Sequence, residues 1–201
     1  MKRNRFQKAE EIFRENNGIL RTSQAIELGI APATLYAMRE SGSIIQENRG
    51  LYRLADQEPP GSPDLVQVAL LVPKAVICLI SALAFHDLTT QIPHRVWIAL
   101  PRQIKKPRIS YPKLEVIWRS KEAYFAGIEV HELDGVPVRI YSREKTLADC
   151  FYYEDRVGKD VMLEAVKEYV RKPNVRVDEL MRQARINKVE DRLRPYLEAL
   201  L

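Results

Sequence analysis

Cysteines and long apolar runs are both scarce in this sequence. Its 201 residues include only two cysteines, Cys78 and Cys150, with no CxxC motif and no histidine at ligand spacing. We therefore expect two buried thiols, and neither a metal site nor a disulfide. No apolar run reaches the ~20 residues of a membrane-spanning helix, and the basic start is not followed by the apolar core of a signal peptide. These absences predict a cytoplasmic protein without a membrane partner.

The motifs of common enzyme classes are missing as well. No GxGxxG, GxxxxGK[ST], HExxH or GxSxG segment occurs, and these motifs carry phosphate cradles, zinc proteases and hydrolase nucleophiles. The scattered His86, His94 and His131 are interpreted as structural residues and not as general bases. A metal-dependent nuclease needs an Asp and a Glu-x-Lys on adjacent strands, and Glu144-Lys145 lacks the intervening residue. We expect no enzyme, no catalytic residue, no cofactor and no metal, with a nuclease as the weaker alternative.

Positive charge is modest overall but locally concentrated. The net charge is +5, from 32 basic and 27 acidic residues, which by itself is a poor argument for a nucleic-acid partner. The segment 102–121, however, carries seven bases and one acid, and the first eight residues carry four bases and no acid. Each patch, taken alone, fits phosphate contact and a solvated surface equally well.

The first 55 residues have the spacing of a helix-turn-helix. Apolar residues repeat at three- and four-residue intervals over residues 5–16, which predicts a helix ended by the following Asn-Gly pair. Thr22 or Ser23 can cap a second, two-turn helix. Gly29 ends that helix, and Pro32 suits the first turn of a third one.

The third predicted helix, residues 32–41, has an outward face suited to DNA. A helical wheel turns Leu35 and Met38 inward. The outward face and its flanks combine small, aromatic and polar residues: Ala33, Thr34, Tyr36 and Arg39. Small side chains allow close approach to a duplex, and tyrosine or arginine can reach a phosphate or a base edge. We predict that these four residues contact DNA.

A β-hairpin is predicted after this helix. Residues 44–54 place apolar residues on both sides of the turn Glu47-Asn48-Arg49-Gly50. Three helices followed by such a hairpin predict a winged helix-turn-helix, with Arg49 at the tip of the wing. The remaining predicted DNA contacts are basic residues outside these elements: Arg21, Lys105, Lys106 and Arg108. A winged helix that binds only a partner protein remains the alternative.

A composition change separates the two halves of the chain. Residues 56–64 combine three prolines, a glycine and three acids without a periodic apolar pattern. We predict a winged-helix domain over 1–55, a linker over 56–63 and a C-terminal domain over 64–201. Strands are predicted at 94–100, 114–118, 128–133 and 136–141, with helices before and after them. The expected class is α+β, a winged helix followed by a mixed α/β domain with a mainly antiparallel sheet and a helical tail.

Three segments carry a family likeness. The first is GILRTSQAIELGIAPATLYAMRESGSIIQENRGLYRLAD. The others are VICLISALAFHDLT, with a Ser-Ala-Leu-x-x-His element at Ser81–His86, and DGVPVRIYSREKTLADCFYY, with a Lys-Thr-Leu-x-Asp element at Lys145–Asp149. Together they resemble AbiEi-type antitoxins, which are bacterial antitoxin-regulators. The resemblance extends over residues 6–172.

The resemblance implies a function for each half. The first domain would bind inverted repeats of double-stranded DNA in its own promoter and repress its operon. The second would counter a cognate nucleotidyltransferase-like toxin, as phage-defence antitoxins do, either by contact or by acting on the toxin's target or product. A stand-alone regulator and an interaction module without a toxin remain the alternatives.

Overall fold

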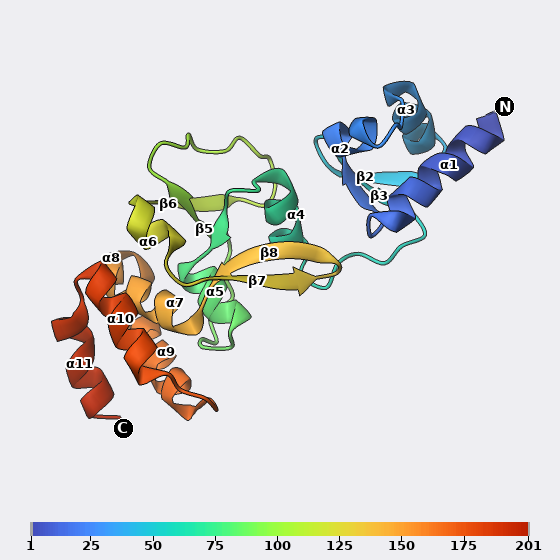
Figure 1. Cartoon of the computed structure of the whole chain (residues 1–201). Helices are drawn as coiled ribbons and strands as arrows, with labels where there is room; N and C mark the ends of the chain where they lie inside the picture. Colours follow the sequence, from blue (N-terminus) through green and yellow to red (C-terminus); the bar gives the residue numbers. More distant parts are fainter. Residues whose placement is uncertain (1, 201) are drawn as a thin grey trace. The chain divides into compact units, whose positions relative to one another are not determined.

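The computed structural model describes residues 2–200, and side chains from residue 5 to residue 200. The side chains of Lys2 and Arg3, part of the basic start, thus lie outside the described residues. The chain forms two compact units (Figure 1). Unit 1 holds the residues up to Pro73 with 108–112 and 132–136, and unit 2 holds the rest. The predicted limits of domain, linker and domain stay a prediction.

Unit 1 contains a winged helix. Its elements are α1 (Lys2–Glu15), β1 (Ile19–Arg21), α2 (Thr22–Glu27), α3 (Pro32–Glu40), β2 (Ile44–Asn48), β3 (Leu51–Leu54) and α4 (Pro63–Leu71). The strands form an antiparallel sheet in the order β1-β3-β2. The predicted helices and wing are therefore present. The sequence indicated only an extended link at β1, because the pairing of β1 with β3 is a long-range contact.

The core of the winged helix comes from the predicted apolar faces. Side chains of all three helices and of the sheet meet there, including Phe13, Ala25, Leu35, Met38 and Ile44. The turn after α1 is closed by the Gly18 N–H, which donates to the Phe13 carbonyl at 2.7 Å.

The cap of α2 differs from the predicted one. The N-cap residue is Arg21, and its N–H donates to the Gln24 side chain at 3.1 Å. The expected cap at Thr22 or Ser23 was thus wrong, because the Gln24 amide already satisfies the backbone at this helix start.

Unit 2 is a mixed sheet with helices. Its elements are β4 (Val76–Ile77), α5 (Leu79–Phe85), β5 (Val96–Pro101), β6 (Leu114–Arg119), α6 (Lys121–Phe125), β7 (Ile128–Leu133), β8 (Val136–Tyr141), α7 (Arg143–Tyr152), α8 (Glu154–Val157), α9 (Lys159–Arg171), α10 (Val177–Asn187) and α11 (Glu190–Glu198). The strand order is β6-β5-β4-β8-β7. Strand β4 is antiparallel to β5, whereas β5 with β6 and β4 with β8 are parallel pairs.

The expected α+β class is confirmed, and so is the winged helix before a mixed α/β domain. The parallel pairs accompany the antiparallel pairing that the sequence predicted. No local pattern indicated the parallel pairs, because the connection between β5 and β6 contains no helix, the usual mark of a parallel crossover.

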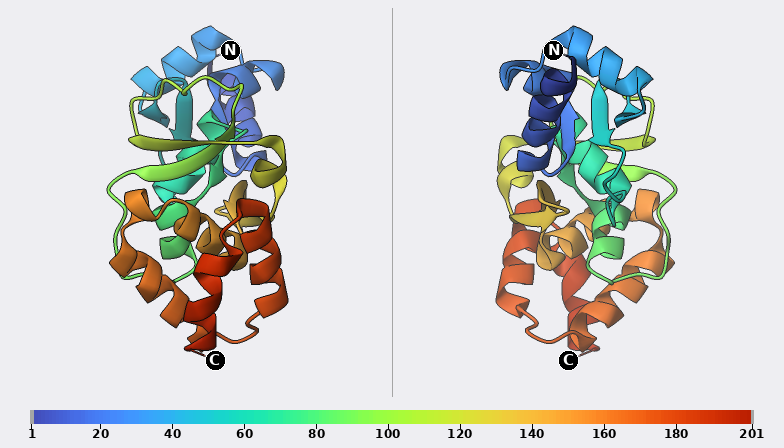
Figure 2. Two further views of the ribbon diagram at one scale, coloured as in Figure 1. Left: turned by 90° about the vertical axis from the view of Figure 1, so that its left-hand side faces the viewer. Right: turned by 90° about the vertical axis from the view of Figure 1, so that its right-hand side faces the viewer.

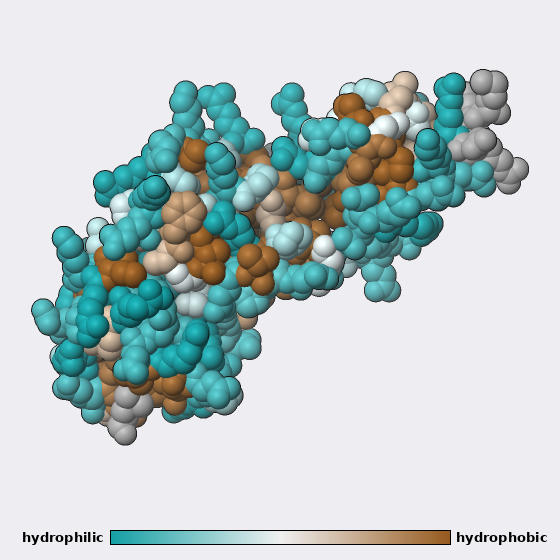
Figure 3. Space-filling model, viewed as in Figure 1, coloured by the Kyte–Doolittle hydropathy of each residue, from teal (hydrophilic) through white to brown (hydrophobic). Residues whose placement is uncertain are grey.

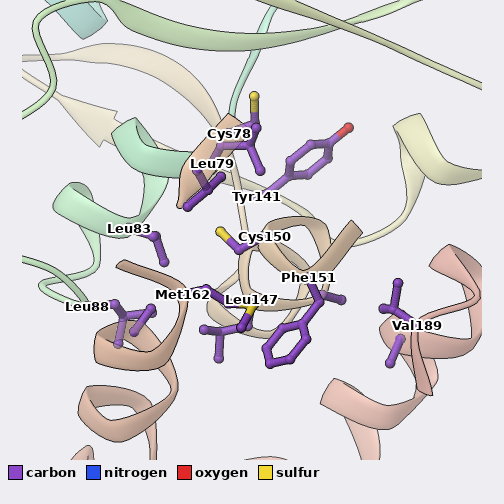
Figure 4. Close-up of a cluster of buried hydrophobic side chains, with 14 of the residues drawn as sticks. Cys78, Leu79, Leu83, Leu88, Tyr141, Leu147, Cys150, Phe151, Met162 and Val189 are labelled. Carbon is purple, nitrogen blue, oxygen red and sulfur yellow. The ribbon is translucent and has the colours of Figure 1, made fainter. Parts of the chain in front are cut away.

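Helix α7 lies at the centre of unit 2. It contacts α5, α9, α10 and α11. In both views of Figure 2 the orange and red helices at the end of the chain gather at the lower end of the picture. Cys78 and Cys150 lie in this core (Figure 4) as free thiols, and burial raises the pKa of both well above the ordinary value. The prediction of two buried thiols is confirmed.

Candidate nucleic-acid interface

Helix α3 presents one face to the core and one to solvent. Leu35 and Met38 are buried at 2% and 0% exposure, whereas the Tyr36 side is open, with that residue 55% exposed. Ala33 and Arg39 are also exposed. The helix begins at Pro32, after an Ala31 N-cap that provides no side-chain hydrogen bond. The outward face is therefore available to a partner.

Arg39 is held in place by two neighbours. Its Nη1 donates to Gln46 Oε1 at 3.3 Å, and its guanidinium carbon lies 5.5 Å from the centroid of the Tyr36 ring. Arginine can read a guanine edge bidentately, and glutamine can read an adenine edge in the same way. The structure thus brings Arg39 and Gln46 together at the junction of α3 and β2.

Sequence reasoning missed Gln46. Strand β2 shifts register between Gln46 and Asn48, so exposed residues do not alternate regularly along it. Because strand alternation is the signal that assigns a side chain to one face, the outward position of Gln46 was not visible in the sequence.

A groove of about 440 Å³ runs between α1 and α3. Its lining includes Arg5 from α1 and Ala33, Thr34, Ala37 and Glu40 from α3. Arg5 and Thr34 also line a second hollow of about 220 Å³, together with Lys8. Two basic side chains of α1 therefore lie beside the first turn of α3, where an anion is favoured by the helix dipole. Glu40 opposes phosphate at the other end of the groove.

The wing is ordered by its own turn. Asn48 Oδ1 accepts the N–H of Arg49 at 2.7 Å, and Gly50 has φ +75°, a left-handed conformation that glycine adopts without strain. Arg49 is exposed at this tip. Arg53, by contrast, is 7% exposed, and its Nε is 2.6 Å from Glu47 Oε1. The wing therefore uses Arg53 for its structure and exposes Arg49 at its tip.

The other predicted contacts lie outside α3 and the wing. Arg21 is half-buried at the end of β1. The connection between β5 and β6 carries Lys105, Lys106 and Arg108, all exposed. Their contact with DNA stays a prediction, as it does for the α3 residues.

A comparison with protein families finds a match over the winged helix. Residues 7–55 match the family described as "Transcriptional regulator, AbiEi antitoxin". The resemblance expected from the sequence is thus confirmed over the winged helix. A search of curated proteins finds no match to the chain.

The Lys145–Asp149 element forms a buried charge network in unit 2. Asp149 Oδ1 accepts from Lys145 Nζ at 2.5 Å, from Arg119 Nη2 at 2.9 Å and from Asn187 Nδ2 at 2.6 Å. Burial lowers the pKa of Lys145, although Asp149 opposes that shift. Two cations thus share one carboxylate, and the network joins β6, α7 and α10.

The Ser81–His86 element also holds the fold together. Ser81 Oγ accepts the N–H of Trp97 at 2.9 Å, which ties α5 to β5. His86 Nε2 lies 2.7 Å from the Tyr141 carbonyl oxygen, and burial lowers the pKa of His86. Both elements of the second half therefore have structural contacts in the core of unit 2.

Within residues 2–200, no group of three or more His, Cys, Asp or Glu side chains is arranged to hold a metal ion. None of the helices in that range combines the length and apolar character needed to cross a bilayer.

Proposed function

We propose that this protein is a DNA-binding autorepressor and the antitoxin of a bacterial toxin-antitoxin system. The observation that carries the proposal is the solvent-exposed face of α3, with Tyr36, Arg39 and Gln46 side by side, in a domain that matches AbiEi regulators. The DNA partner is an inverted repeat in its own promoter.

In this proposal α3 enters the major groove, whose width admits a helix. Ala33 lets the backbone approach, Thr34 and Tyr36 contact phosphate or a thymine methyl, and Arg39 with Gln46 reads base edges. Arg49 meets the adjacent backbone from the wing. Phosphate contacts fix the register of the protein, and base contacts supply the sequence preference.

The basic residues outside α3 add affinity without sequence preference. Arg21, Lys105, Lys106 and Arg108 contact phosphates in this proposal, and each contact releases counterions from the duplex. In this proposal the winged-helix domain at 1–55 reads the DNA sequence. The C-terminal domain at 64–201 contributes the phosphate contacts of Lys105, Lys106 and Arg108 and the antitoxin activity.

A mobility-shift assay tests the DNA part. We expect the wild type to shift its own upstream DNA more strongly than a scrambled duplex. Arg39→Ala should lose about 1 to 3 kcal/mol on the native site and much less on the scrambled one, because a base contact is lost. Arg14→Ala is the matched control, since Arg14 is an exposed arginine of α1 that pairs with Asp56. Equal losses on both duplexes would reduce Arg39 to a backbone contact.

Coexpression tests the antitoxin part. Support comes from the Ser81–His86 and Lys145–Asp149 elements that resemble the antitoxin domain of the family. A nucleotidyltransferase-like toxin encoded beside this gene should arrest growth alone and not together with this chain. If cells that express the toxin stay arrested although this chain is present at normal levels, the antitoxin role is refuted. The protein would then be a cytoplasmic stand-alone repressor without a role in phage defence.

A protein-interaction module is the second candidate, and one observation favours it. Ile26 of α2 and Leu28, the C-cap residue of that helix, are each 45% exposed, and Ile45 of β2 is 43% exposed. Hydrophobic residues, brown in Figure 3, show on the surface of unit 1 among hydrophilic ones. Exposed apolar patches mark binding surfaces for proteins. Failure of the wild type to shift either duplex would favour this candidate.

A further inference from the structure

Unit 2 contains a cavity that the DNA-binding proposal does not use. Its volume is about 370 Å³, and it is lined by ten residues from the ends of β6, α7 and α10, the start of α6 and the segment after β5. This size lies at the lower end of the range for small-molecule sites, roughly 300 to 1,000 Å³.

The lining has charge of one sign. Arg102, Arg119 and Lys188 are among the ten lining residues, and none of the ten is an aspartate or glutamate. All ten belong to the described part of the chain. Three cations without a lining carboxylate favour an anionic occupant.

The Arg119 guanidinium has N–H groups that its hydrogen bonds do not use. Its side chain is only 6% exposed. Its Nη2 donates to Asp149 at 2.9 Å and to the Asn187 side chain, and its Nη1 donates to Tyr153 Oη at 3.3 Å. The guanidinium has five N–H groups, so two remain, and Nε is buried without a partner among the described residues. The Nε is enclosed, so the second Nη1–H is the donor that this arrangement leaves for an anion in the cavity.

Two aromatic side chains line the same cavity and are partly open to solvent. Trp118 is 41% exposed and Tyr152 is 51% exposed. The Arg119 guanidinium carbon lies 5.0 Å from the centroid of the Tyr152 ring. An aromatic surface next to a cationic one suits a ligand with a flat ring at one end and an anion at the other.

Lys188 has a backbone conformation that its side chain does not favour. It caps α10 with φ +58°, the left-handed region in which helices usually end on glycine. Strained backbone of this kind also occurs at ligand-binding sites. Glycine at this position would remove the ammonium group and relieve the backbone.

We propose that this cavity binds a nucleoside monophosphate. Its phosphate lies among Arg102, Arg119 and Lys188, and its base lies against Trp118 and Tyr152. The proposal goes beyond DNA binding and does not depend on it, because the site is built entirely within unit 2.

Calorimetric titration of the full chain tests the site with three probes: AMP, adenosine and inorganic phosphate. We expect AMP to bind more tightly than either fragment. Lys188→Gly should weaken AMP binding roughly tenfold, through loss of one hydrogen bond to a charged group, without lowering the thermal midpoint. Tyr152→Leu should weaken AMP and leave phosphate unchanged. Lys167→Ala, at an exposed lysine of α9 that does not line the cavity, is the matched control.

Four results would contradict the proposal. The first is no heat with AMP at millimolar concentration. The second is AMP binding that Lys188→Gly and Tyr152→Leu leave unchanged. The third is a loss of operator affinity in Lys188→Gly without any loss of AMP affinity, which would make the cavity part of the DNA surface. Equal affinity for phosphate and AMP would refute the base contact.

Discussion

Replacement of Asp149 by asparagine should strongly destabilise unit 2. The Asp149, Lys145 and Arg119 side chains are 3%, 0% and 6% exposed, so solvent cannot replace the lost carboxylate. Removing one partner of a buried ion pair costs about 3 to 5 kcal/mol. Here one carboxylate serves two cations, so we expect the upper part of that range.

Glu190→Gln is the matched control. It makes the same change from carboxylate to amide at a residue that also holds two cations, Arg185 at 2.9 Å and Arg194 at 2.6 Å, but Glu190 is 24% exposed and both arginines are more than half exposed. Surface pairs contribute about 0 to 1 kcal/mol. The control should therefore lose much less unfolding free energy than Asp149→Asn, because solvent screens its ion pairs.

Urea denaturation followed by tryptophan fluorescence measures both changes. Trp97 and Trp118 are the two tryptophans of the chain, and both lie in unit 2. The signal therefore reports the unit that contains the network.

Lys145→Met provides the sharper comparison. It leaves Arg119 with Asp149, one cation with one anion, so it should cost less than Asp149→Asn. A cost for Lys145→Met equal to or above that of Asp149→Asn would refute the view that the network carries excess positive charge.

The cost of Asp149→Asn should also fall at high pH. Asp149 opposes the lowering of the Lys145 pKa, so its removal lowers that pKa further. A lysine whose pKa is lower in the folded state penalises folding fully below that pKa. The penalty is relieved as the pH rises toward the unfolded value of about 10.4. The unfolding free energy of Asp149→Asn should therefore lie closer to that of the wild type at pH 9.5 than at pH 7.

Two further predictions concern surface charge. Joint replacement of Lys105, Lys106 and Arg108 by alanine should reduce the magnitude of the slope of log affinity against log salt by about 2.7 if all three contact phosphate, at about 0.9 per contact. Mobility shifts at several salt concentrations measure this slope, and an unchanged slope would show that the three residues do not contact DNA. Hydrogen bonds from Arg182 lower the pKa of Glu179 to about 2, so its contribution to stability is present above about pH 4.3 and is lost as the pH falls toward 2. Glu179→Gln should flatten acid unfolding curves in that window by no more than about 1 kcal/mol.

The local features of the winged helix were visible in the sequence. Helical spacing, the Asn-Gly stop after α1, Pro32 at the start of α3 and the Asn-Arg-Gly turn of the wing are short-range signals, each set by neighbouring residues. They also determined that Tyr36 faces outward and Met38 inward, because both follow from a 3.6-residue period. The Asp-Gly turn between β7 and β8 was visible for the same reason.

The tertiary structure decided what depends on contacts between distant segments. It paired β5 with β6 in parallel, placed Gln46 beside Arg39 through an irregular strand, and buried Lys145 and Arg119 around Asp149. Sequence patterns could not show this, because a charged residue has the same local signal whether it is solvated or buried beside a partner 30 positions away. Period and turn chemistry are local properties of a chain, whereas burial and ion pairing arise only when the whole chain has folded.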